Sequence, residues 1–207
     1  MRTIVAALAV ALATSIVWAD DEPVRPKPAG HATQQVEGWT VHVDRRLIEG
    51  DADDVALGKH ARRLLDVRLY EIAMVVPEAP LAHLRKVPIW LDRTHGKLER
   101  AQYHPSADWL KANGYDPKLA RCVHIPDAAE WSSARHQQVQ PWSVLHELAH
   151  AYHDQVLGFD NPEIAAAWER FRSSGKYDEP VLHTGGTPRK HYALTNPMEF
   201  FAEFSES

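Results

Sequence analysis

Trp142 to His150 read Trp-Ser-Val-Leu-His-Glu-Leu-Ala-His, which sets the pattern His-Glu-x-x-His inside an apolar stretch. Residues four apart in a helix lie one above the other, so the imidazoles of His146 and His150 can bind one metal ion. The carboxylate of Glu147 is then free to act on a water molecule beside the ion. The pattern predicts a helical zinc site with two histidine ligands and Glu147 as general base.

The residues around the motif indicate that it lies on a helix and is not a chance match. By chance alone, the bare motif would occur in roughly one chain in twenty of this composition. Pro141 stands near its start and Gly158 past its end, as helix termini prefer. At 100° per residue the two histidines fall together beside a single apolar face. That face consists of Leu145, Leu148, Ala149, Tyr152 and Val156.

The N-terminal segment has the composition of a secretory signal. One arginine precedes a short apolar run at residues 4–17, and an acidic stretch follows Ala19. We expect cleavage after Ala19 and export to the periplasm or the medium. An uncleaved anchor is the other interpretation, although the run is shorter than the ~20 residues that a spanning helix prefers. Residues 20–37 are expected to form a flexible, proline-rich leader, and residues 38–207 one domain.

Charge and cysteine content narrow the possible partners. The net charge is −5 at pH 7, which argues against a nucleic-acid partner. No second stretch matches the hydrophobicity of the first, so we expect no stable membrane insertion after signal cleavage. Cys122 is the only cysteine, so an internal disulfide is excluded, and its apolar neighbours predict a buried strand residue. The oligomeric state is not indicated.

The periodicity of the remaining chain predicts an α+β domain, in which a small mixed sheet packs on the motif helix. Strands are expected at residues 38–43, 87–91 and 120–125, and helices at residues 51–76, 127–137 and 161–175. A sheet edge around Gln102 to His104 could align an extended peptide.

A catalytic zinc ion usually has three protein ligands, so a third donor must lie elsewhere in the chain. Asn196-Pro197 predicts the start of a C-terminal helix that carries Glu199 and Glu203 one turn apart on the same side. Helical spacing alone leaves either carboxylate as the ligand. Glu199 could also close a capping box with Asn196, since it falls three positions later.

The motif helix together with Tyr192 to Glu203 resembles the lethal-factor-like zinc metallopeptidases, the family of the catalytic domain of anthrax toxin lethal factor. The resemblance covers about two dozen residues and implies a zincin-like fold. It implies Glu199 as the third zinc ligand and Tyr192 as the residue that faces the reacting carbonyl of the substrate. Glu203 is then expected not to bind the ion but to contact one of the ligating histidines and orient its ring.

Other histidines fall outside this set. His153 is seven residues after His146, about 10 Å along a helix, and is expected at the surface or behind a ligand rather than on the ion. His104 and His124 have no motif around them, so structural or substrate-contact roles are expected for both.

These features together predict an exported zinc metallopeptidase whose partner is a peptide or protein substrate. Zinc bound by His146, His150 and Glu199 would acidify water, Glu147 would take its proton, and Tyr192 would help stabilise the oxyanion. The alternative is a zincin-fold protein that binds zinc or a partner without hydrolysis. Pure binding requires neither a base nor an oxyanion donor, which favours the enzyme.

Overall fold

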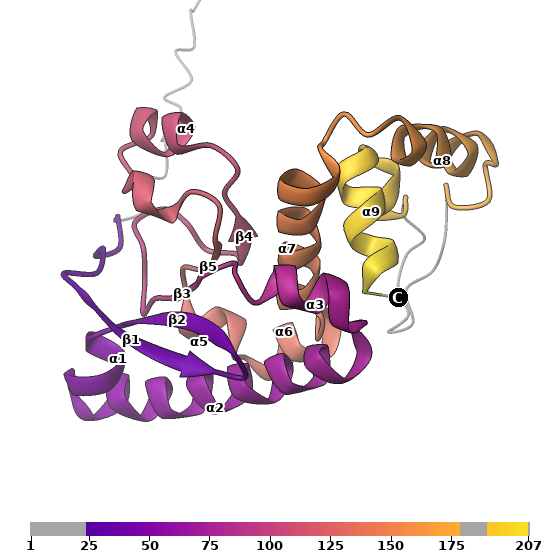
Figure 1. The fold of residues 1–207 in the computed structure, drawn as a ribbon. Helices are drawn as coiled ribbons and strands as arrows, with labels where there is room; N and C mark the ends of the chain where they lie inside the picture. Colours follow the sequence, from indigo (N-terminus) through magenta and orange to yellow (C-terminus); the bar gives the residue numbers. More distant parts are fainter. Residues whose placement is uncertain (1–23, 179–189, 207) are drawn as a thin grey trace, which may run out of the picture.

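A computed structural model of the chain describes residues 24–178 and 190–206, and the described part is a mixed α+β fold (Figure 1). The α+β class predicted from the sequence is therefore confirmed. The predicted signal, residues 1–19, lies outside the described residues, as do residues 20–23 of the predicted leader. No helix in the described part is both long and apolar enough to cross a membrane.

The sheet has the order β1-β2-β3-β5-β4, with a parallel centre and an antiparallel strand at each edge. Its strands are β1 (His31–Val36), β2 (Trp39–Asp44), β3 (Ile89–Leu91), β4 (Gln102–Tyr103) and β5 (Val123–Ile125). The three predicted strands are confirmed, each within about three residues of its expected ends. β4 forms the edge nearest the motif helix.

The flexible leader predicted for residues 20–37 is wrong for its last part, because residues 31–36 form β1. This strand pairs with β2 along its whole length, from His31 opposite Asp44 to Val36 opposite Trp39. Glu37 and Gly38 both have positive φ, 49° and 92°, as a two-residue hairpin turn requires. β1 is a half-exposed edge strand, so its mainly polar sequence carries little hydrophobic periodicity.

Helices make up most of the remaining described chain. They are α1 (Arg46–Glu49), α2 (Ala52–Val75), α3 (Glu78–Leu84), α4 (Ala107–Ala112), the 3₁₀ turn η1 (Pro117–Leu119), α5 (Ala128–Trp131), α6 (Ala134–Val139), α7 (Ser143–Tyr152), the π-helical turn η2 (His153–Leu157), α8 (Pro162–Ser173), the 3₁₀ turn η3 (Tyr192–Leu194) and α9 (Pro197–Ser205). The helices predicted at 51–76 and 161–175 are confirmed. The one predicted at 127–137 is two short helices, because Ser133 caps a new helix by accepting from His136 N.

The main core lies between one face of the sheet and helices α2 and α7 (Figure 1). Alternate residues of β3 and β5 point into it, among them Ile89, Leu91 and Ile125. α1 approaches α2 at Gly58, where a Cβ would lie 1.9 Å from the Leu47 carbonyl oxygen. This contact has room only for glycine.

The opposite face of the sheet is covered by the segment that runs from Arg93 to Arg121 and contains α4. Its small apolar cluster consists of Leu110, Leu119 and Cys122, with Trp90 and Tyr115 packed against it. Cys122 is buried, as predicted, and its thiol donates to Leu119 O at 2.7 Å.

Candidate metal centre

α7 carries the His-Glu-x-x-His motif and is held by its apolar face. Leu145 and Leu148 on this helix are buried in the main core. His146 and His150 are partly exposed and face Glu199 of α9, whereas the partly exposed Glu147 faces β4. Val156, which we predicted on the buried face, is 41% exposed. The helix changes to a π-helical turn at His153, and the wider turn rotates later residues off the apolar face.

The structure brings the three predicted ligands together. His146 Nε2 lies 3.1 Å from Glu199 Oε2 and 3.1 Å from His150 Nε2, and His150 Nε2 lies 3.3 Å from Glu199 Oε2. Zinc at 2.0–2.1 Å from tetrahedral ligands separates neighbouring donor atoms by about 3.3 Å. The three donors therefore already have the spacing and the chemistry of a zinc site.

α9 presents Glu199 to the histidines and lies beside α7 (Figure 1). Asn196 is its N-cap and accepts from Glu199 N at 2.8 Å, and Pro197 occupies the first helical position. The backbone of Glu199 thus takes part in the cap, while its carboxylate faces His146 and His150. The carboxylate is thus placed where a metal ligand would be needed, and no hydrogen bond from Asn196 N to it, as a capping box requires, is found among the described residues.

Two further carboxylates lie away from Glu199, on the Nδ1 side of the His146 ring. Its Nδ1 is 3.3 Å from Glu206 Oε1 and 3.8 Å from Glu203 Oε1. We expected Glu203 in this place and missed Glu206, although residues 199, 203 and 206 share one helical face. A carboxylate on the second ring nitrogen fixes the tautomer and orientation of a ligating histidine.

The charges of the centre are strongly coupled. Burial alone would lower the pKa of His146, but hydrogen bonds to Glu199 and Glu206 and the charge of Glu147 raise it to about 10. Burial would likewise raise the pKa of Glu199, but the two histidines lower it to about 2. The protonation of His146 and the negative charge of Glu199 are therefore coupled, and binding of a cation by these residues would release protons.

Glu147 is anchored to the edge of the sheet. Its Oε2 accepts from the backbone N–H of Tyr103 in β4 at 2.6 Å. The Tyr103 hydroxyl donates to Asp154 at 2.6 Å and accepts from Gln155 at 3.0 Å, which ties β4 to η2. Burial raises the pKa of Glu147 above the ordinary value of a carboxyl group, toward the range in which a general base works best. Sequence reasoning missed Tyr103 because the bond to Glu147 spans 44 residues and involves the backbone.

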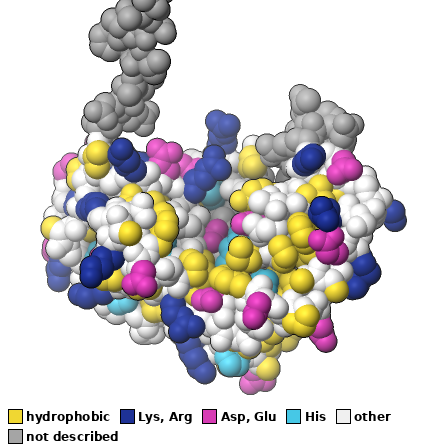
Figure 2. All heavy atoms as spheres, turned by 90° about the horizontal axis from the view of Figure 1, so that it is seen from above, with side chains coloured by type: hydrophobic (Ala, Val, Ile, Leu, Met, Phe, Trp, Pro, Cys, Tyr) yellow, Lys and Arg dark blue, Asp and Glu magenta, His cyan; other side chains and the backbone are white. Residues whose placement is uncertain are grey.

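Tyr192 stands at the mouth of the centre, in η3. Its ring centroid is 6.4 Å from that of His146, and the residue is 56% exposed. Partial burial and the charges of Glu199 and Glu147 raise the pKa of its hydroxyl, so the group remains a hydrogen-bond donor at neutral pH. Seen from above, the surface has a hollow with histidine and acidic side chains inside it and hydrophobic ones along it (Figure 2).

His153 is fully buried, with 0% exposure, so the surface position that we considered for it is wrong. The π-helical turn directs its ring between Phe159 and Phe201, with ring centroids 5.2 and 4.9 Å away. Among the described residues, neither ring nitrogen has a hydrogen-bond partner. His153 also does not join the cluster of donor atoms formed by His146, His150 and Glu199.

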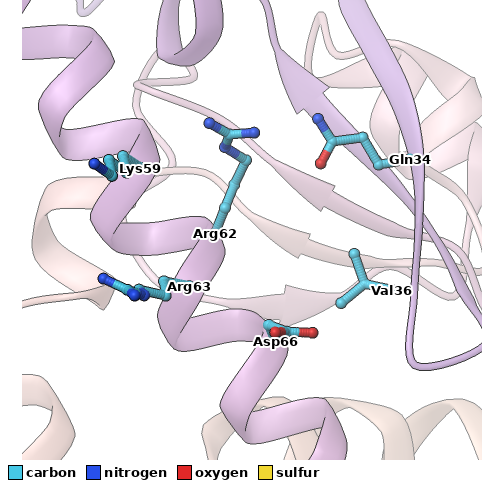
Figure 3. Close-up of a pocket in the computed structure, with 6 residues that line it drawn as sticks. All are labelled: Gln34, Val36, Lys59, Arg62, Arg63 and Asp66. Atoms are coloured by element: carbon cyan, nitrogen blue, oxygen red, sulfur yellow. The ribbon is translucent and has the colours of Figure 1, made fainter.

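Two hollows lie outside the centre itself. One lies between β1 and α2 and contains none of the predicted site residues (Figure 3); it is lined by Gln34, Val36, Lys59, Arg62, Arg63 and Asp66. The other includes Tyr192 and is lined in addition by Arg172, Asp178, Lys190, His191, Leu194 and Thr195. The second hollow adjoins the mouth of the metal centre.

No protein-family model, no curated protein and no solved structure matches this chain. Its function is therefore inferred from the geometry of the site.

Proposed function

We propose that the chain is an exported zinc metallopeptidase with a zincin-like fold, of the kind that lethal-factor-like metallopeptidases exemplify. The observation that carries the proposal is the spacing of His146 Nε2, His150 Nε2 and Glu199 Oε2, between 3.1 and 3.3 Å. This spacing fits tetrahedral zinc without rearrangement. A carboxylate at Glu147, directly beside the ligands, supports hydrolysis over simple metal binding.

Each residue has a role that follows from its position. A bound zinc ion would supply Lewis-acid polarisation of the scissile carbonyl and of water. Glu147, held by Tyr103 N–H and with a raised pKa, takes a proton from the attacking water and delivers it to the leaving amine. The water oxygen first forms a bond to the carbonyl carbon, and the C–N bond breaks afterwards, once its nitrogen has accepted that proton. Tyr192, with its hydroxyl protonated, donates to the developing oxyanion.

The substrate we propose is a peptide or protein in extended form. β4 is an edge strand of the sheet, and its residue Tyr103 already contacts the proposed general base. A peptide that pairs with this edge would bring its carbonyl groups past Glu147. The hollow beside Tyr192 would then receive a neighbouring side chain of the substrate.

The test compares the wild type with Glu147→Gln on a peptide library, with zinc content measured for both. Glu147→Gln should keep its zinc and lose about 10²- to 10⁴-fold in cleavage rate, because the ligands remain and the base is gone. Glu169→Gln, at an exposed α8 residue paired with Arg172, is the matched control and should cleave normally. Equal cleavage by Glu147→Gln would refute the mechanism. A wild type that binds zinc and cleaves nothing in the library would instead indicate a binding protein.

A further inference from the structure

A second group of histidines surrounds Asp92, on the face of the sheet opposite α2 and α7. Asp92 directly follows β3, His124 lies in β5, His95 lies in the loop after β3, and His31 begins β1. Strand residues alternate between faces, so Ile125 points into the main core while its neighbour His124 points to this side. None of these residues belongs to the centre on α7.

The donor atoms of this group converge on one carboxylate. Asp92 Oδ2 lies 2.6 Å from His95 Nδ1 and 2.7 Å from His124 Nε2, and Oδ1 lies 2.7 Å from His31 Nε2. Asp92 and His124 are 0% exposed and His95 is 6% exposed. Three residues therefore aim nitrogen and oxygen donors at one buried point, the ligand types that zinc takes in proteins.

The charge of the group favours a cation. Among the described residues, no arginine or lysine pairs with Asp92; all of its ion-pair partners are histidines. A buried carboxylate without a permanently charged partner is costly, and a divalent cation would offset that cost.

We propose that Asp92, His95 and His124 form a second, structural zinc site, with a water molecule as the fourth ligand that tetrahedral zinc requires. The present spacings of 2.6 and 2.7 Å are those of hydrogen bonds, so the donor atoms must separate by about 0.6–0.7 Å to reach the tetrahedral spacing of about 3.3 Å. His95 belongs to a loop and can move away from Asp92, and rotation of the Asp92 carboxylate can lengthen its distance to His124.

Two further histidines support the ligands. His31 holds the second oxygen of Asp92, and His104 Nε2 lies 3.2 Å from His124 Nδ1. When His124 Nε2 binds the ion, the ring proton of His124 lies on Nδ1. His104 Nε2 can then accept a hydrogen bond from Nδ1. Such a hydrogen bond behind a ligating imidazole fixes its tautomer.

The position of the site explains what the ion would do. It would join the ends of β3 and β5 to the loop after β3, and through His31 also reach β1. The segment that covers this face has only a small apolar cluster of its own. With Cys122 as the only cysteine, no internal disulfide can fasten the segment. A metal ion commonly supplies stability where the apolar core is small.

The experiment counts zinc in chains that lack one site or the other. In the full chain we expect about two zinc ions per molecule, and about one in the double variant His146→Ala/His150→Ala, which leaves the second site intact. His95→Gln should also retain about one, and it replaces a loop residue, so its fold can be preserved. His42→Gln, a histidine in β2 that lies outside the cluster, is the matched control and should retain the full content.

The outcomes separate this proposal from the proposed function. A folded double variant that binds no zinc overturns the second site and leaves the α7 centre unaffected. A double variant that keeps its zinc, while His95→Gln has none, supports the second site and overturns the α7 centre. Chelation should also lower the melting temperature of the double variant; an unchanged melt would show that the ion has no structural role. Circular dichroism checks that each variant is folded.

Discussion

Two helices of this protein begin with the same Asn-Pro pair, and only one of them carries a proposed zinc ligand. Asn196 caps α9 by accepting from Glu199 N at 2.8 Å. Asn161 caps α8 by accepting from Glu163 N at 3.0 Å and from Ile164 N at 3.2 Å. We predict that Asn196→Ala and Asn161→Ala destabilise the fold to a similar extent, but that only Asn196→Ala weakens zinc binding.

The magnitudes follow from the cap. Replacing an asparagine N-cap by alanine costs about 1 kcal/mol of unfolding free energy. In Asn196→Ala the loss falls on the first turn of α9, which contains Glu199 at its third position. If zinc must restore that turn, about 1 kcal/mol is also lost from binding, which corresponds to an affinity about fivefold lower. In Asn161→Ala the frayed turn contains no ligand, so the affinity should be unchanged.

Zinc affinity is measured by competition with a fluorescent chelator, and stability by urea unfolding of the metal-free chains. The comparison requires that both variants lose stability, since this shows that both caps were real. Equal zinc affinity in two destabilised variants would refute the reasoning, because it would mean that the first turn of α9 does not position Glu199.

Three more predictions concern residues outside the ligand set. Gly58→Ala should destabilise by about 1–3 kcal/mol despite the better helix propensity of alanine, because its Cβ would meet Leu47 O; a gain in urea stability would argue against the close approach. His153→Phe should stabilise by about 1–3 kcal/mol by removing a buried, unpartnered ring. Burial lowers the pKa of His153, so below about pH 6.5 the unfolded chain binds more protons than the folded chain. The stability of the wild type therefore falls as pH falls through this range. Urea titrations at two pH values should show a weaker fall for His153→Phe. Glu206→Gln should reduce zinc affinity about 10-fold by replacing the charged acceptor beside Nδ1 of His146 with a neutral one, and an unchanged affinity in a chelator competition would assign that role elsewhere.

Local patterns explain what was predictable from the sequence. The apolar spacing predicted α2 to within a residue at each end, and Asn161 with Pro162 predicted the start of α8. The spacing of His146 and His150 placed both on one side of a helix. In each case the signal lies within a few residues of the structure that it specifies.

Features that depend on distant segments were not predictable in this way. The carboxylate of Glu147 meets a backbone N–H of Tyr103, for which no side-chain pattern exists. β1 has a polar sequence and is stabilised mainly by pairing with β2. The cluster at Asp92 draws its histidines from three separate segments, so sequence spacing gave no reason to group His31 or His124 with it.

β4 connects the two sides of the molecule through consecutive residues. The backbone N–H of Tyr103 donates to the proposed general base at the edge of the sheet, and the side chain of His104, which directly follows β4, contacts His124 on the face opposite the main core. Two adjacent residues at this edge therefore contact both clusters. β4 is only two residues long and pairs with β5 alone, which gives it few bonds of its own. Its position, and with it the orientation of Glu147, therefore depends on side-chain contacts on both sides: those of Tyr103 with Asp154 and Gln155, and that of His104 with His124.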